Sequence, residues 1–318
     1  MVWLTLRQHR LAIGSVAALL LAIGAYVLLT GLPMHHAYED GGVGPCLGSA
    51  TTACRDAVHR FSETYAGAGK GVVGTLNLVP MLLGLFVGAP LLARELEQRT
   101  HRLVWTQGVS RRRWLAVKLV AMLLVTAAAA VAFTAMMTWW RWPLDQLQGR
   151  FEELAFNFEG PVVTAYALFA FALGIAAGVV LRSTVVAMGV TFAGWLALRL
   201  PVENLLRPYY LPPVTTTADP ANRAILTGSR GSWALGSGFV DRAGHRLANA
   251  DADALFRRAA DAGIDPSDYL RDHGIRQFFE YQPADRWLAF QAIEAAIFVA
   301  AALLLLALAL AWVRWRTA

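Results

Sequence analysis

Six long apolar segments, separated by shorter polar stretches, run through this sequence. They cover residues 11–30, 71–92, 115–140, 161–181, 184–200 and 287–313. A helix needs about 20 mostly apolar residues to cross the hydrocarbon core of a bilayer. Of the 318 residues, 57% are apolar and only 16% are charged, which is too few charges for a soluble globule. We therefore predict an all-α membrane protein with six transmembrane helices, and we exclude a soluble enzyme, a disordered chain and a small disulfide-rich protein.

Lysine and arginine are distributed unevenly between the two sides of this predicted bundle. If the N-terminus lies inside, the inner segments hold 12 basic and two acidic residues, whereas the outer segments hold 16 basic and 19 acidic residues. An excess of basic residues in short loops marks the cytoplasmic side. We therefore expect both termini in the cytoplasm and a multi-pass protein of the bacterial cell membrane. The same distribution accounts for the net charge of +6 without a nucleic-acid surface.

This topology divides the chain into spans and segments outside the lipid. Arg182 and Ser183 alone separate spans four and five, which predicts a tight helical hairpin, and span five is short and meets Pro201, which suggests a broken or re-entrant end. The segments are 1–30 (cytoplasmic N-terminus and span one), 31–70 (outer loop), 71–92 (span two), 93–114 (inner segment), 115–140 (span three), 141–160 (outer loop), 161–181 (span four), 184–200 (span five), 201–286 (large extracytoplasmic insertion), 287–313 (span six) and 314–318 (cytoplasmic tail).

The insertion at 201–286 is polar and rich in proline, glycine and arginine–aspartate pairs. Its sequence predicts one helix over 251–260 that ends near Gly263. A second helix is predicted to begin at Asp265-Pro266, because proline is favoured at the first helical position. A loop of this length usually carries function or a fold of its own.

The only two cysteines, Cys46 and Cys54, lie in the first outer loop. Because this side of the membrane is oxidising, we expect a local disulfide between them; two free thiols are the alternative. Metal binding with His35, His36 or His59 matches no standard ligand spacing. We therefore predict no metal site.

The inner segment 93–114 carries an amphipathic pattern. One helical stripe holds Leu92, Leu96, Arg99 and Leu103, and polar or charged residues flank it: Glu95, Gln98 and Arg102. Such a helix is typical of the membrane interface, with an interruption at Gly108 and a new helix start at Ser110. The pattern alone fits two interpretations, a basic helix that only fixes topology and a docking surface for a cytoplasmic protein.

The sequence lacks the patterns of an enzyme. Gly69-Lys70 does not form a phosphate-binding loop, because the required earlier glycine and the following Ser or Thr are missing. Ser229, His245 and His273 in the insertion accompany no nucleophile-elbow pattern. We therefore predict no catalytic residues and no cofactor in this chain, so that any energy source must be an ion gradient or another chain.

Glu294 is the one acidic residue inside a predicted span. Charged residues at membrane depth are usually functional or paired. We expect Glu294 to lie near the outer end of span six, within reach of Arg199. A structural ion pair and a proton relay both fit this position.

The inner segment also carries the residues of a family resemblance. Leu92 through Thr100, then Thr106 through Arg111 and Arg113 through Lys118, resemble the inner loop of permease subunits of ATP-binding-cassette (ABC) type-2 exporters, in the actinobacterial style. The topology is similar over nearly the whole chain, and the motif over about 27 residues. Arg99 replaces the usual glycine before Thr100, which places the local turn in question.

The resemblance implies a mechanism for the whole assembly. A second permease, identical or related, pairs with this chain, and separate ATPase subunits bind ATP and magnesium beneath the pair. The implied docking residues on a cytoplasmic coupling helix are Arg94, Glu95, Leu96, Arg99, Thr100, Arg102, Leu103 and Trp105. The implied cargo is an amphipathic or lipid-like substrate or drug that moves along spans two and five, with 201–286 as a lid. The alternative function is a membrane-anchored sensor or assembly protein whose outer domain binds a ligand or partner.

Overall fold

The computed structural model describes residues 2–49, 51–97, 111–220 and 231–316. Within these residues, six helices are long and apolar enough to cross a membrane. They are α2 (Arg10–Asp40), α5 (Val79–Glu97), α7 (Arg111–Gln148), α9 (Pro161–Leu181), α10 (Thr184–Pro201) and α14 (Trp287–Arg316). Six candidate spans therefore agree in number and order with the six apolar segments of the sequence.

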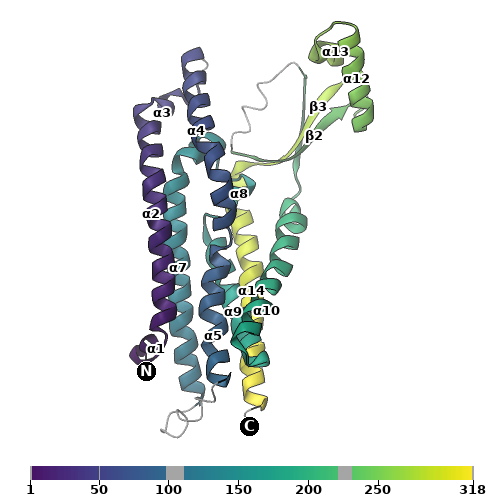
Figure 1. Ribbon diagram of the computed structural model, residues 1–318. Helices are drawn as coiled ribbons and strands as arrows, with labels where there is room; N and C mark the ends of the chain where they lie inside the picture. Colours follow the sequence, from purple (N-terminus) through teal and green to yellow (C-terminus); the bar gives the residue numbers. More distant parts are fainter. Residues whose placement is uncertain (1, 50, 98–110, 221–230, 317–318) are drawn as a thin grey trace.

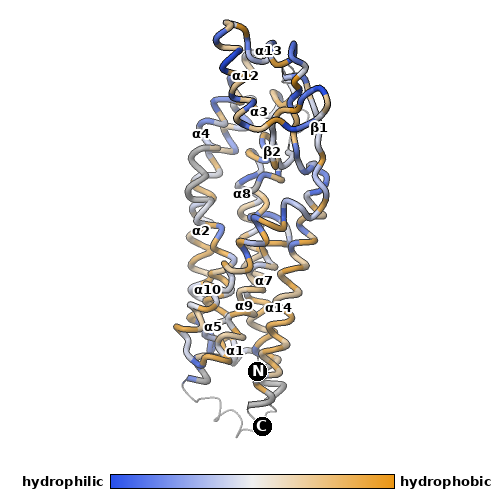
Figure 2. The backbone as a smooth tube through the Cα atoms, turned by 90° about the vertical axis from the view of Figure 1, so that its right-hand side faces the viewer, coloured by the Kyte–Doolittle hydropathy of each residue, from blue (hydrophilic) through white to orange (hydrophobic). Residues whose placement is uncertain are grey.

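The long helices run side by side, and both termini lie at the same end of the bundle (Figure 1). The short helix α1 (Val2–Gln8) precedes α2 at this end, where α5 ends and α7 begins. The helices α12 (Asn249–Asp261) and α13 (Pro266–Asp272) lie at the opposite end. Figure 2 shows hydrophobic residues along the middle of the bundle and hydrophilic residues around α12 and α13.

Helix α9 occupies the centre of the bundle and packs against α5, α7, α10 and α14. Glycines permit its close approach to α5. A Cβ atom on Gly84 would lie 2.5 Å from the carbonyl oxygen of Ala167, and one on Gly174 would lie 2.6 Å from the amide nitrogen of Ala89. Small residues at such crossings are a common basis of helix association in membranes, where helix packing replaces the hydrophobic effect. Span two is therefore held mainly by span four.

Several helices extend beyond the predicted spans. The expected loop at 31–70 is largely helical, because α2 continues to Asp40 and is followed by α3 (Val43–Cys46) and α4 (Thr52–Leu76). Aromatic contacts hold this extension, including a stacked pair between His35 and Trp139 at 4.5 Å and an edge contact between Tyr38 and Phe61. Pro33 is accommodated inside α2. The sequence analysis did not predict these helices, because the segment is too polar to be recognised as part of a membrane span.

The tight hairpin between spans four and five is confirmed. α9 ends at Leu181, Arg182 takes a left-handed conformation with φ of 54°, and α10 begins at Thr184. At its other end α10 does not stop at Pro201. It continues into the π-helix η1 (Val202–Leu206) and the 3₁₀-helix η2 (Arg207–Tyr209), so the irregularity expected at Pro201 is a change of helix type.

The prediction of an all-α fold is wrong for residues 201–286. Three strands, β1 (Val214–Ala218), β2 (Trp233–Val240) and β3 (Arg276–Gln282), form an antiparallel sheet in the order β1-β3-β2. Thr216 and Ser237 both pair with Phe279 of the central strand. The physical reason is the β-branched and aromatic content of these short runs. Their pairing partners lie 36 to 67 residues apart along the chain, so no single segment reveals the sheet.

The two helices predicted in this region are confirmed. α12 covers the predicted stretch, and α13 begins at Pro266, with Asp265 as its N-cap. The Asp265 carboxylate accepts a hydrogen bond from the Ser267 amide at 2.8 Å, which is the standard way to satisfy a first-turn donor. The three strands with α12 and α13 thus form a small α/β unit, which we call the outer domain, at the end of the bundle away from the termini (Figure 1).

Candidate functional site

A buried group of charged side chains lies where α9, α10 and α14 meet near the outer domain. Its centre is Glu294 on α14, whose side chain has no solvent exposure. Arg199 from α10 and Arg207 from η2 are each 1% exposed. Arg199 Nη1 lies 3.2 Å from Glu294 Oε1, and Arg207 Nη2 lies 2.7 Å from the same oxygen. The pairing of Glu294 with Arg199 expected from the sequence is therefore present.

The change of helix type after Pro201 places the second arginine. Glu203 lies on η1, and its carboxylate contacts Arg199 at 3.4 Å and Arg207 at 3.5 Å. π-helical turns widen a helix and often occur at functional positions. Asn157 completes the contacts, because it accepts a hydrogen bond from Arg207 at 2.9 Å and donates one to Glu203 at 2.6 Å. Two arginines and two glutamates balance in charge.

Every acceptor position of Glu294 is occupied by a donor. Besides both arginines, the hydroxyl groups of Tyr166 and Tyr210 donate to this carboxylate. Removing one member of a buried ion pair leaves an uncompensated charge, which costs about 3–5 kcal/mol. Of the two interpretations of Glu294, this geometry favours the structural ion pair over a proton relay, because the carboxylate has no solvent exposure and both of its oxygens bind protein donors. We call Glu294, Arg199, Arg207, Glu203 and Tyr166 the ion cluster.

The sequence missed Arg207 and Tyr166. Arg207 follows Pro201, so the sequence analysis places it in the insertion 201–286 and not in a span. The spacing of Arg199, Glu203 and Arg207, four residues apart on each step, was the available signal for a continued helix. Tyr166 has no such signal, since an aromatic residue in an apolar span is most often a packing residue.

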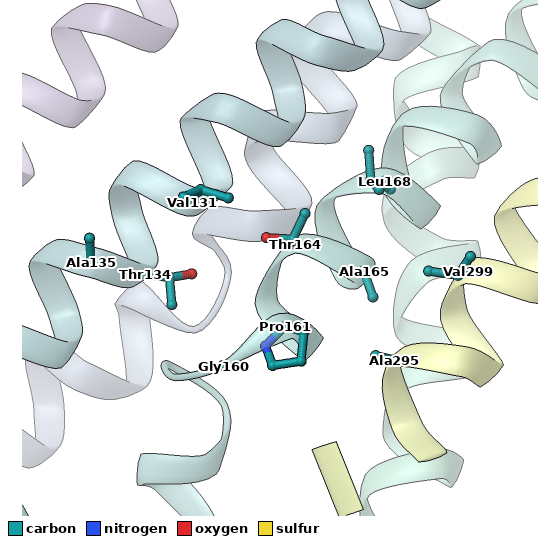
Figure 3. Close-up of a pocket in the computed structure, with 10 residues that line it drawn as sticks. All are labelled: Val131, Thr134, Ala135, Gly160, Pro161, Thr164, Ala165, Leu168, Ala295 and Val299. Carbon is teal, nitrogen blue, oxygen red and sulfur yellow. The ribbon is translucent and has the colours of Figure 1, made fainter. Parts of the chain in front are cut away.

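An apolar groove lies between α7, α9 and α14 (Figure 3), and it faces outward, because Val131 and Val299 in its lining are 57% and 37% exposed. It has a volume of about 520 Å³, and its walls come from three helices. The lining residues are Val131, Thr134 and Ala135 of α7, Gly160, Pro161, Thr164, Ala165 and Leu168 at α9, and Ala295 and Val299 of α14. Ala165 and Ala295 are the chain neighbours of Tyr166 and Glu294. The groove and the ion cluster therefore occupy different faces of the same helices.

A second polar group lies beside Gly160, the lining residue that precedes α9. Arg150 Nε donates to Glu159 Oε2 at 2.6 Å, and the Arg150 guanidinium lies 4.4 Å from the ring centre of Trp287. Gln291 donates to the Phe156 carbonyl at 3.0 Å and accepts from the Val162 amide at 3.2 Å. These contacts fix the turn that leads into α9.

The predicted docking residues are only partly within the described chain. Arg94 is exposed at the end of α5, and Glu95 and Leu96 lie in the last turn of the same helix. The other five predicted docking residues lie outside the described residues: Arg99, Thr100, Arg102, Leu103 and Trp105.

Glu97, which was not singled out from the sequence, makes a specific contact at this end of the bundle. Its Oε2 atom accepts hydrogen bonds from the Thr184 amide at 3.2 Å and the Thr184 hydroxyl at 3.0 Å. The N-cap residue of α10, Ser183, provides no capping side chain. Glu97 of α5 therefore caps the N-terminus of α10, and the contact joins span two to span five within the inner segment 93–114.

The comparisons with known proteins identify the family. The model of the family described as ABC-2 membrane transporter related matches residues 17–207, which is more than half of the chain. The chain belongs to this family. No curated protein and no solved structure matches it.

Family membership and the six apolar helices make this ABC-2 protein a multi-pass membrane protein and a transporter permease. Permeases of this family are generally the non-catalytic membrane component and associate with ABC ATPase subunits. The matched residues include Tyr166, Arg199, Glu203 and Arg207 of the ion cluster. Glu294 lies beyond the match, so the cluster joins the family region to the last helix.

Two further predictions about this permease concern its cysteines and metals. Cys46 and Cys54 are joined by a disulfide in the structure. The bond links α3 to α4 at the end of the bundle where the outer domain lies. Among the described residues, no group of three or more His, Cys, Asp or Glu side chains is arranged to hold a metal ion.

Proposed function

We propose that this ABC-2 permease is the membrane subunit of an ATP-driven exporter in a bacterial cell membrane. It pairs with a second permease, and separate ATPase subunits, which bind ATP and magnesium, dock on the cytoplasmic side. The cargo is an amphipathic or lipid-like molecule. The family match over residues 17–207 is the observation that carries this proposal. The basic inner segment supports it, because it connects α5 to α7, and these helices end and begin at the end of the bundle that holds both termini.

The contacts around α5 suggest how docking would be transmitted. α5 itself carries the first proposed docking residues, Arg94 to Leu96, and Glu97 at its end binds the N-terminus of α10. α5 also packs along α9 and α10. A push on the segment after Glu97 would therefore move spans two and five together rather than span two alone.

The ion cluster supports a transmission path to the opposite end of the membrane. α10 carries Thr184 at one end and Arg199 at the other, and Arg199 is bound to Glu294 of α14. η1 and η2 continue from α10 toward β1 of the outer domain. Movement of α10 would thus reach the outer α/β unit, which we propose to act as a lid on the exit side.

The test is reconstitution with the ATPase encoded beside this chain's gene. We expect the two proteins to co-purify and amphipathic compounds to stimulate ATP turnover in lipid nanodiscs. Reversing charge in the docking segment with Glu95→Lys and Arg102→Glu should weaken co-purification about tenfold, the effect of losing about 1.4 kcal/mol of binding free energy. Arg55→Glu on exposed α4 is the matched control. Unchanged co-purification of the docking variants would instead favour a sensor or assembly protein.

A further inference from the structure

The groove between α7, α9 and α14 lies on the outside of the bundle and within three candidate spans. Figure 3 shows the ten lining residues on the three helices around this space. The two threonines, Thr134 and Thr164, are the only polar side chains among its lining residues. The Thr134 hydroxyl donates to the Ala130 carbonyl of its own helix at 2.9 Å, so this hydroxyl is already satisfied. The groove therefore offers an almost entirely hydrocarbon surface to the bilayer.

This surface determines what can fill the groove. A water molecule needs two to four polar partners to occupy a cavity, and the lining offers almost none. An empty groove would lose the dispersion contacts of all its lining atoms. A lipid tail is as apolar as the leucine and valine side chains of the walls. An acyl chain of the surrounding bilayer is therefore the occupant that the chemistry favours.

The outer-domain end of the groove adds a cation at the place where a lipid head group would lie. Gly160 lines this end, and a Cβ atom on it would be 3.0 Å from the Trp287 ring. Arg150 lies over the same ring at 4.4 Å, and its side chain is 50% exposed, whereas its partner Glu159 is fully buried. Tryptophan side chains favour the interface between lipid and water.

The guanidinium of Arg150 is held in position by one of its three nitrogen atoms. Among the described residues its Nε atom binds Glu159, and its two Nη atoms make no hydrogen bond. An arginine fixed through one side presents the remaining N–H groups in the planar arrangement that binds phosphate. The groove thus combines an apolar channel for a tail with an oriented donor for a phosphate at its mouth.

We propose that α7, α9 and α14 form a binding site for one phospholipid of the leaflet nearest the outer domain. One acyl chain occupies the apolar groove, and the phosphate binds Arg150 beside Trp287. The site does not depend on ATP-driven export. A failed co-purification with an ATPase leaves it standing, and its own failure leaves the exporter proposal standing.

The first experiment locates the bound tail. The full chain is placed in nanodiscs that contain phosphatidylglycerol with a diazirine on one acyl chain, illuminated, and analysed by peptide mass spectrometry. We expect labelling to concentrate at Val131, Leu168 and Val299, above the level at the exposed α2 residues Leu21 and Leu29. Even labelling of all exposed apolar helices would show only bulk bilayer contact and would overturn the proposal.

The second experiment fills the groove. Ala295→Trp places a large ring at its wall, and Leu28→Trp adds the same ring to an exposed position on α2, which contributes no residue to the lining. We expect about tenfold less groove labelling in the first variant, equivalent to about 1.4 kcal/mol of binding free energy, and none of this loss in the second. Val299→Trp serves as the groove variant if the unfolding temperature of Ala295→Trp is lowered. Equal labelling in all three variants would contradict the site.

The third experiment tests the phosphate contact. The double variant Arg150→Gln with Glu159→Gln removes the cation without leaving a buried carboxylate unpaired. A diacylglycerol probe with the same diazirine tail lacks the phosphate. We expect the double variant to reduce labelling by phosphatidylglycerol to the level given by diacylglycerol, and Arg150→Lys to restore part of it. If both probes label the native groove equally, Arg150 does not bind the head group.

Discussion

Arg207 binds both oxygens of Glu294, with Nη2 at 2.7 Å from Oε1 and Nε at 2.7 Å from Oε2. This bidentate pair joins the 3₁₀ turn after span five to span six. Bidentate arginine–carboxylate contacts have the best defined geometry among ion pairs. The segment between α10 and β1 is therefore anchored to α14 at Arg207, before the chain enters the outer domain.

Glu294→Gln tests the structural importance of this anchor. The substitution keeps the shape of the side chain but leaves Arg199 and Arg207 with too little negative charge in a buried place. We expect the free energy of unfolding to fall by about 3–5 kcal/mol, measured in detergent by denaturant titration. Glu280→Gln is the control, because Glu280 pairs with a largely exposed Arg246 in the outer domain. This control should change stability by less than about 1 kcal/mol, and a similar effect of both variants would contradict the structural role of the cluster.

The membrane helices could be predicted from the sequence because each one is specified by its own apolar segment. An apolar run of sufficient length forms a helix wherever its neighbours lie, and the single step at Arg182 and Ser183 permits only a hairpin. The helix start at Asp265-Pro266 is equally local. The sheet was missed because β3 pairs with β1 across more than 50 residues of chain, and such partners are not encoded in any one segment.

Part of the ion cluster could be predicted from the sequence, because charged residues are rare in the membrane spans. Glu294 and Arg199 were the charges available near one depth of the membrane, so their pairing could be expected. Arg207 could not, since the π-helix that brings it back to Glu294 follows a proline that usually ends a helix. The role of Glu97 depends on the tertiary contact with Thr184, which no pattern in the sequence indicates.

The disulfide between Cys46 and Cys54 gives a prediction about stability under reducing conditions. A loop of this size constrains the unfolded chain by about 2–3 kcal/mol. We expect dithiothreitol to lower the unfolding temperature of the native protein. The double variant Cys46→Ser with Cys54→Ser should show this lower temperature with or without reductant. An identical unfolding temperature of the native protein in both conditions would show that the bond contributes nothing to stability.

His9 predicts a dependence of stability on pH. Burial, followed by the nearby charges of Lys118 and Arg94, lowers the pKa of His9 from 6.5 to about 4. Between these two values the unfolded chain takes up a proton that the folded chain does not, so stability is lost as the pH falls from 6.5 toward 4. We expect His9→Gln to reduce this loss, measured as unfolding temperature against pH. An unchanged pH profile would mean that His9 titrates normally in the folded protein.

Glu97 gives the most direct test of the link between spans two and five. Glu97→Ala removes the acceptor for the Thr184 amide, and loss of an N-cap costs about 0.5–2 kcal/mol. We expect faster hydrogen exchange over the first turn of α10 and no change in α14. Glu97→Gln is the matched control, because it retains an oxygen acceptor and should keep most of the protection. In the assembled transporter, Glu97→Ala should retain ATPase binding but reduce transport per ATP hydrolysed, since α10 would no longer follow α5. If transport and hydrolysis fall together in both variants, the carboxylate charge rather than the cap is what the assembly requires.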